Sequence, residues 1–116
     1  MRGLTRTQDA YGHAMYDHLR GKGGYEIVER DDGLIAHSRG PAEYFAAYKD
    51  WEAMDRKAIR FARGRVLDIG CGAGRVALYL QEKGHDVLGT DVLSRGAAMF
   101  DFPGERFSLR EPCATL

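Results

Sequence analysis

The chain has 116 residues, of which 44% are hydrophobic, and a formal net charge of zero, as in an ordinary globular domain. A balanced charge means that the chain has no excess of basic residues to attract nucleic acid or a membrane surface, so we expect neither as a partner. No apolar run exceeds five residues, so no transmembrane span is expected. Two cysteines make no disulfide framework, and the four histidines are scattered without metal-ligand spacing. We therefore expect a cytoplasmic protein with reduced thiols and no bound metal.

The first part of the chain predicts a helix and a β-hairpin. Apolar residues at helical spacing over 10–19 predict the helix, and Gly21 ends it. Residues 25–30 and 34–36 predict two short strands, because they flank the turn signal at 31–33. The hairpin would lie close to the N-terminal helix in sequence and form one layer with it.

Two more helices are expected before the next strand. Pro41 can open a short helix, because proline suits the first helical turn. A longer helix is expected from Trp51 to about Ala62, capped by Asp50 and stopped by Gly64. Its apolar stripe would consist of Trp51, Met54, Ala58 and Phe61.

A strand followed by a glycine loop is the most informative pattern in the sequence. The run Arg65–Ile69 is β-branched and apolar, as expected of a buried parallel strand, and it carries one acid, Asp68. Three glycines then alternate with small residues in the order Gly70, Cys71, Gly72, Ala73 and Gly74. Glycine has no Cβ, so the backbone can turn sharply here and lie directly against a ligand.

The segment after the loop completes a β-α-β unit. Gly84 ends the predicted helix, and residues 86–91 predict a second strand that finishes in the carboxylate of Asp91. Two strands joined by one helix should be parallel and connected right-handedly. Ligands in such sheets bind outside the carboxyl ends of the strands, where Gly70 and Asp91 would meet. The apolar face of the helix would consist of Ala73, Val76, Ala77 and Leu80.

This pattern resembles motif I of the class I S-adenosylmethionine-dependent methyltransferases. The resemblance implies that loop 70–74 wraps the methionine part of the cofactor, Asp68 supports its amino group, and Asp91 binds its ribose hydroxyls. It implies methyl transfer to a small-molecule acceptor, mostly through positioning, and no catalytic residue is assigned. The implied cofactor-binding residues are Asp68, Gly70, Cys71, Gly72, Gly74 and Asp91.

A NAD-dependent oxidoreductase is the rival interpretation. Residues 72–77 fit the G-x-G-x-x-A fingerprint, and Asp91 lies about 20 residues further on. Two features disfavour it. With Gly70 as the first glycine, the third glycine position holds Arg75, which is too large for close helix–strand packing. Asp68 at the end of the strand suits a cofactor with a positive amino group better than a pyrophosphate.

Other residues near the motif have simpler interpretations. Cys71 is expected to be a small packing residue in the loop rather than a nucleophile, and Arg75 a solvated helix residue. The aromatic residues of the N-terminal layer either line the acceptor side of the pocket or belong to the core; they are Tyr44, Tyr48 and Trp51. His13 and His37 could act as acid–base groups, but no pattern places them at the site.

The expected fold class is α/β, a Rossmann-like class I methyltransferase fold that is incomplete and has only its first two or three core strands. We divide the chain into an N-terminal helical and hairpin cap, 1–49, and a partial S-adenosylmethionine-binding domain, 50–116. Residues 107–109 would supply a third strand, and Glu111 is a candidate for contacts on the adenine side.

The resemblance also implies a consequence of the missing strands. In the family the first core strand lies between the second and the fourth, so here strand 65–69 would have an open edge. We expect an N-terminal fragment, or a product with an altered tail after about Val92, in which the missing acceptor half leaves this chain alone inactive. The alternatives are a short form that completes its sheet as a homodimer, and a non-catalytic cofactor-binding or interaction module.

Overall fold

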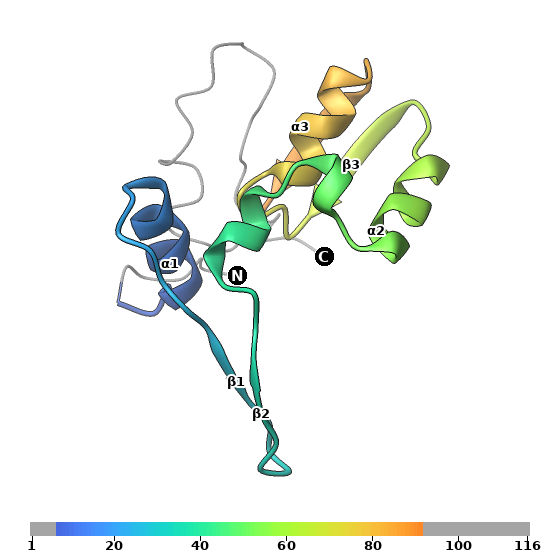
Figure 1. The fold of residues 1–116 in the computed structure, drawn as a ribbon. Helices are drawn as coiled ribbons and strands as arrows, with labels where there is room; N and C mark the ends of the chain where they lie inside the picture. Colours follow the sequence, from blue (N-terminus) through green and yellow to red (C-terminus); the bar gives the residue numbers. More distant parts are fainter. Residues whose placement is uncertain (1–6, 92–116) are drawn as a thin grey trace, which may run out of the picture.

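A computed structural model describes residues 7–91 of the chain (Figure 1). The elements follow one another as α1 (Ala10–Leu19), β1 (Ile27–Glu29), β2 (Ile35–His37), the 3₁₀ helices η1 (Pro41–Phe45) and η2 (Tyr48–Asp50), α2 (Ala53–Ala58), the 3₁₀ helix η3 (Ile59–Phe61), β3 (Arg65–Ile69), α3 (Arg75–Glu82) and β4 (Asp86–Thr90). The predictions for Val92, residues 107–109 and Glu111 lie outside the described residues. No helix within residues 7–91 has the length and apolar character needed to span a bilayer.

Helix α1 confirms the first predicted helix and begins at a cap that the apolar spacing did not indicate. The side chain of Asp9 is fully buried, and its Oδ1 accepts a hydrogen bond from the Gly12 amide at 2.8 Å. A carboxylate in this position satisfies one of the free amides of the first turn and suits the helix dipole. Gly21 follows the helix with a φ of 72°, as expected of a residue that ends it.

The β-hairpin is confirmed, with shorter strands than the sequence predicts. Strands β1 and β2 pair antiparallel, with Ile27 opposite His37 and Glu29 opposite Ile35. All six strand residues are exposed, because the hairpin projects away from the rest of the molecule (Figure 1). Gly33 closes the turn by donating to the Arg30 carbonyl at 2.8 Å.

The helix before β3 differs from its prediction in length, cap and buried face. It begins after Glu52, without a side-chain cap, because the backbone of Trp51 is extended, and Asp50 lies in η2. Met54 and Phe61 are 80% and 75% exposed, so the predicted apolar stripe is wrong. The predicted stripe required one continuous α-helix from Trp51. The observed α-helix, α2, begins only at Ala53, and the 3₁₀ helix η3 follows it. Ile59 and Ala62 pack against the core instead.

The β3–α3–β4 unit confirms the predicted β-α-β pattern. Strands β3 and β4 are parallel and in register from Arg65 opposite Asp86 to Ile69 opposite Thr90. Helix α3 covers one face of this pair, and the core there consists of Ala77, Leu80 and Val87, each at most 3% exposed. The opposite face of β3 differs from the expectation of a buried strand, because Leu67 and Ile69 are 55% and 78% exposed within the described part of the chain.

Glycines define both ends of α3. Gly74 has left-handed backbone angles, φ 76° and ψ 12°, which let the chain leave the loop and enter the helix at once. Gly84, with φ 90°, is the residue after the last turn, as predicted. Its amide donates to the Gln81 carbonyl at 2.9 Å, and the amide of His85 donates to the Leu80 carbonyl at 3.0 Å. These two bonds form a Schellman motif, which fixes the helix end and the start of β4.

Candidate functional site

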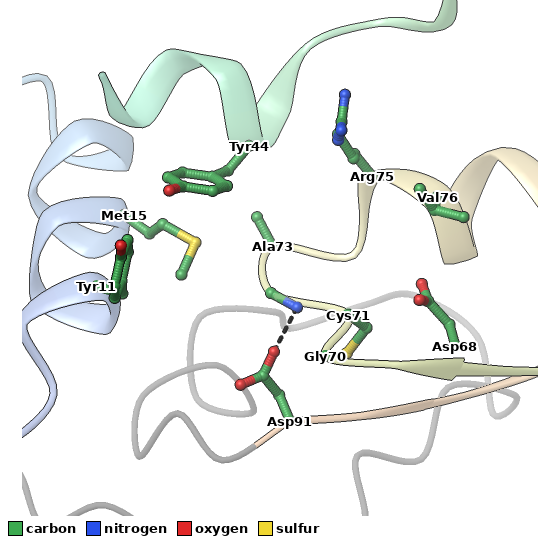
Figure 2. A pocket seen from close by; sticks show the side chains of 11 residues that line it. Tyr11, Met15, Tyr44, Asp68, Gly70, Cys71, Ala73, Arg75, Val76 and Asp91 are labelled. Atoms are coloured by element: carbon green, nitrogen blue, oxygen red, sulfur yellow. Dashed lines mark hydrogen bonds between the residues drawn. The ribbon is translucent and has the colours of Figure 1, made fainter. Parts of the chain in front are cut away.

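The glycine loop is attached to the end of β4 by three hydrogen bonds from its own amides. Gly70 and Cys71 both donate to the Thr90 carbonyl, at 2.7 and 3.0 Å. The amide of Gly72 donates to Oδ2 of Asp91 at 2.6 Å (Figure 2). The predicted meeting of the loop with Asp91 is therefore present, and it takes the form of a direct charge-assisted bond.

Asp68 reaches the same region from the end of β3. Its Oδ2 atom is buried and has no hydrogen-bond partner within residues 7–91. Burial raises the pKa of Asp68, the backbone amide of Ala77 lowers it, Asp91 raises it further and Arg75 lowers it. A buried carboxylate oxygen without a donor is costly, so this position favours a ligand that brings a hydrogen-bond donor or a positive charge.

A cavity of about 400 Å³ lies between the glycine loop and the N-terminal layer. Tyr11 and Met15 of α1 and Tyr44 of η1 face the loop from the other side of this cavity (Figure 2). The complete lining is Tyr11, Met15, Tyr44, Asp68, Gly70, Cys71, Gly72, Ala73, Arg75, Val76 and Asp91. Its volume lies within the range of small-ligand sites. We call it the loop cavity.

The loop cavity brings together five of the six predicted cofactor-binding residues, and the sixth has a different position. Gly74 is buried and is not part of the lining, because it provides the left-handed turn into α3. Cys71 is 8% exposed, and burial, followed by Asp68 and Asp91, raises the pKa of its thiol to about 12. A thiol that stays protonated is a poor nucleophile, which agrees with its interpretation as a packing residue.

The aromatic wall of the loop cavity is fixed by a carboxylate of the hairpin region. The Tyr44 hydroxyl donates to Oε2 of Glu26 at 3.3 Å, and Ser38 Oγ donates to the same oxygen at 2.7 Å. Burial, followed by the Glu26 carboxylate, raises the pKa of Tyr44 to about 12. Tyr11 meets the Tyr44 ring edge-on, with the ring centroids 6.2 Å apart. The spacing of α1 indicated only that Tyr11 was helical, so its place in this wall was missed.

Arg75 is not the solvated helix residue that the sequence suggested. Its side chain is 25% exposed, and its Nη2 lies 2.9 Å from Oδ2 of Asp55 in α2. The guanidinium carbon lies 5.0 Å from the ring centroid of Trp51. Both contacts join segments that are 20 or more residues apart, and no local sequence signal indicates them.

A second cavity, of about 370 Å³, adjoins the first. We call it the aromatic cavity, and its lining is Tyr44, Phe45, Ala46, Ala47, Tyr48, Trp51, Ala73, Arg75, Leu78, Tyr79 and Glu82. The three aromatic residues considered for the acceptor side thus separate: Tyr44 lines both cavities, whereas Tyr48 and Trp51 line only the aromatic one. His13 and His37 are exposed and line neither cavity.

The hydrogen bonds of the loop bear on the rival dinucleotide interpretation. A pyrophosphate binds to free amides of a glycine loop and of the following helix N-terminus. Here the amides of Gly70, Cys71 and Gly72 already donate within the protein, and the carboxylate of Asp68 lines the same cavity. The position that would receive a phosphate therefore carries a carboxylate, which favours a cofactor with a positive group at this end.

Comparison with known proteins agrees with this geometry. Residues 42–111 match a family model described as a methyltransferase domain. In structure the chain resembles a S-adenosylmethionine-dependent methyltransferase from Bacteroides fragilis that was crystallised with S-adenosyl-L-homocysteine. The TM-score is 0.77 at 26% sequence identity, over 90% of this chain and 44% of that protein.

Two curated relatives are similar over most of this chain. YqeM of Bacillus subtilis (strain 168), a protein named as a methyltransferase, is 31% identical over 81 residues. The S-adenosyl-L-methionine-dependent Diels-Alderase iccD of Talaromyces variabilis is 31% identical over 83 residues. These matches cover 70% and 67% of this chain but 28% of each relative, so the chain spans less than a third of their length. It belongs to the class I S-adenosylmethionine-dependent methyltransferase family and has part of that Rossmann-like fold.

Proposed function

We propose that this chain is the cofactor-binding part of a S-adenosylmethionine-dependent methyltransferase that acts on a small molecule. The observation that carries the proposal is the buried Oδ2 of Asp68, which has no donor within residues 7–91, in a residue that lines the cavity bounded by the glycine loop. An α-amino group would supply the missing donor and the compensating charge. The proposal includes the division into a cap, 1–49, and a partial cofactor domain, 50–116, and a cytoplasmic setting.

The loop cavity fits the other parts of the cofactor as well. Asp91 would accept hydrogen bonds from the two ribose hydroxyls while its Oδ2 holds the Gly72 amide. A Cβ atom built on Gly70 or on Gly72 would meet no other atom within 4 Å, so open space lies against the bare backbone at these two positions. Tyr11, Met15 and Tyr44 would cover the ligand and limit its contact with water.

The chemistry required of the protein is then small. When bound, the cofactor would supply a reactive methyl group on a positively charged sulfur, which is the chemistry of the transfer. The contribution of Asp68, Asp91 and the loop is to hold the donor in one orientation. The described residues offer no acid–base group in the loop cavity besides these two carboxylates, Arg75, Tyr11, Tyr44 and Cys71.

A second candidate is a chain that binds the cofactor without transferring its methyl group. The similarity to a Diels-Alderase that depends on S-adenosyl-L-methionine favours this alternative. The family and the loop cavity are common to both candidates, so cofactor binding does not separate them. Methyl transfer by the chain to any acceptor would exclude the second.

Isothermal titration of the 116-residue chain with S-adenosylhomocysteine tests the proposed site, and NADH is the control ligand. Saturable binding of S-adenosylhomocysteine alone is the expected result. Binding of NADH alone would contradict the proposal and restore the dinucleotide interpretation. Failure to bind either ligand would show that residues 1–116 do not form a working cofactor site by themselves.

A further inference from the structure

We propose that the aromatic cavity binds an uncharged, flat ring, and that this ring belongs to the acceptor that is processed at the neighbouring loop cavity. The second half of this statement rests on the proposed function, whereas the first half depends only on the lining of the aromatic cavity. The two cavities share the wall formed by Tyr44, Ala73 and Arg75, so one ligand pair can occupy both.

Three polar side chains of the aromatic cavity have partners within the protein. The indole Nε1 of Trp51 donates to the Ala46 carbonyl at 2.7 Å, and the Tyr44 hydroxyl donates to Glu26. The Arg75 guanidinium is neutralised by Asp55 at 2.9 Å. Glu82 is exposed at the end of α3, so its carboxylate can remain in water. A charged ligand would lose water here and would have to compete with these existing pairs, which is unfavourable.

Cations of the protein occupy aromatic faces that a cationic ligand would need. Arg75 lies 5.0 Å from the ring centroid of Trp51, and Lys83 lies 5.4 Å from that of Tyr79. Tyr48 stacks on Tyr79 with the ring centroids 4.4 Å apart and an angle of 7° between the planes. The rings of Tyr48, Trp51 and Tyr79 therefore already contact one another or a cation of the protein, whereas a site for a quaternary ammonium group has free aromatic faces.

An uncharged ring is the ligand class that remains. Aromatic pairs favour offset or edge-to-face contacts, and Trp51 already meets Tyr79 and Tyr48 at 61° and 65°. A ring in the cavity would extend this arrangement while burying apolar surface against Leu78 and Phe45. The volume of about 370 Å³ suits a molecule of one or two fused rings.

The test titrates the 116-residue chain calorimetrically with three naphthalene probes. Calorimetry is used because naphthalene absorbs and emits in the same range as tryptophan and would mask the emission of Trp51, which lines the cavity. We expect 2-naphthol to bind saturably, and 2-naphthoate and 2-naphthylmethylammonium to bind at least about tenfold more weakly, since each carries an unpaired charge. Equal binding of the three probes, or no saturable change with 2-naphthol, would overturn the proposal.

A pair of matched variants locates the binding. Ala47→Phe places a side chain at an exposed cavity residue that does not line the loop cavity, whereas Ala42→Phe makes the same change at an exposed position outside both linings. The first should weaken 2-naphthol binding about tenfold or more and leave S-adenosylhomocysteine binding unchanged, and the second should change neither. Equal behaviour of the two variants toward 2-naphthol would refute this location.

The two proposals fail separately. If S-adenosylhomocysteine binds and 2-naphthol does not, the assignment of the aromatic cavity is wrong and the cofactor site stands. If 2-naphthol binds with the expected dependence on Ala47 and S-adenosylhomocysteine does not, the ring site stands and the proposed cofactor site is wrong. If neither binds, both proposals are refuted for this chain.

Discussion

Asp91 combines a structural and a proposed binding role in one carboxylate. Its Oδ2 accepts the Gly72 amide at 2.6 Å, which fixes the loop in the shape that bounds the cavity. A charge-assisted bond of this length is stronger than a neutral one. The same residue is proposed to hold the cofactor ribose, so its loss would remove ligand contacts and the support of the loop together.

Asp91→Ala should therefore weaken S-adenosylhomocysteine binding by about 2–4 kcal/mol, or roughly 30- to 1,000-fold. Asp91→Asn is the matched control, because its side-chain oxygen can still accept from Gly72 while the charge is lost, and it should have an intermediate effect. Calorimetric titration measures both. Wild-type affinity in the alanine variant would show that the assigned site is wrong.

Asp68 should lower the stability of the protein near neutral pH. Burial, as the main cause, raises its pKa in the folded state. A group with a raised folded pKa stabilises the fold fully below its ordinary unfolded pKa, and this contribution is lost as the pH rises through the folded value. Above that folded value Asp68 is ionised in an unfavourable site, as expected if the position is used for the proposed binding rather than for stability.

Asp68→Asn should accordingly raise the Tm at pH values above the raised folded pKa of Asp68. The gain should shrink as the pH falls through that folded pKa and should be lost below the ordinary unfolded pKa of about 4. The same variant should bind S-adenosylhomocysteine more weakly. Asp50→Asn, at an exposed aspartate, is the control and should change neither property. A Tm difference that is constant with pH would contradict an electrostatic cause.

At the scale of elements, local sequence patterns predicted the helices and strands, whereas contacts between distant segments could not be predicted. The strand, loop and helix from Arg65 to Gly84 followed from β-branched residues, alternating glycines and a glycine stop, which act within a few residues. The apolar stripe of α2 failed because the extended Trp51 turns toward Tyr48 and Tyr79. The position of Tyr11 in the wall of the loop cavity and the Arg75–Asp55 ion pair could not be predicted, since both depend on tertiary packing.

Helix α1 provides an element-scale prediction, because it carries one wall of the loop cavity. Asp9→Ala would leave the Gly12 amide without its cap and should destabilise the protein by about 1–2 kcal/mol. Asp9→Asn keeps a cap oxygen and should retain most of the stability. Urea denaturation measures the difference. An equal loss in both variants would assign the effect to the charge of Asp9 rather than to the cap.

For the molecule as a whole, the sheet face opposite α3 is an apolar surface that nothing within residues 7–91 buries. Leu67 and Ile69 are more than half exposed, and β3 pairs only with β4 among the described strands. An open strand edge beside an apolar face is a template for pairing with another chain. Dimerisation of the chain through this edge is the alternative to an N-terminal fragment, and it can be tested directly.

Sedimentation velocity over a range of concentrations should show self-association of the 116-residue chain. The double substitution Leu67→Lys with Ile69→Lys should shift the population to monomer, because it places charge on the proposed contact face. Leu34→Lys with Ile35→Lys makes the same change on the exposed hairpin, and it should leave association unaltered. A wild-type monomer at every concentration would rule out this interface.

The bonds between the glycine loop and β4 have a consequence for hydrogen exchange. Loop amides usually exchange quickly, because small local openings expose them to water. Here the amides of Gly70 and Cys71 donate to Thr90, and that of Gly72 donates to Asp91. Each can exchange only when the loop separates from the end of β4. Slow exchange at these three amides would therefore report the opening of the parallel strand pair, and the loop would behave as a part of the sheet.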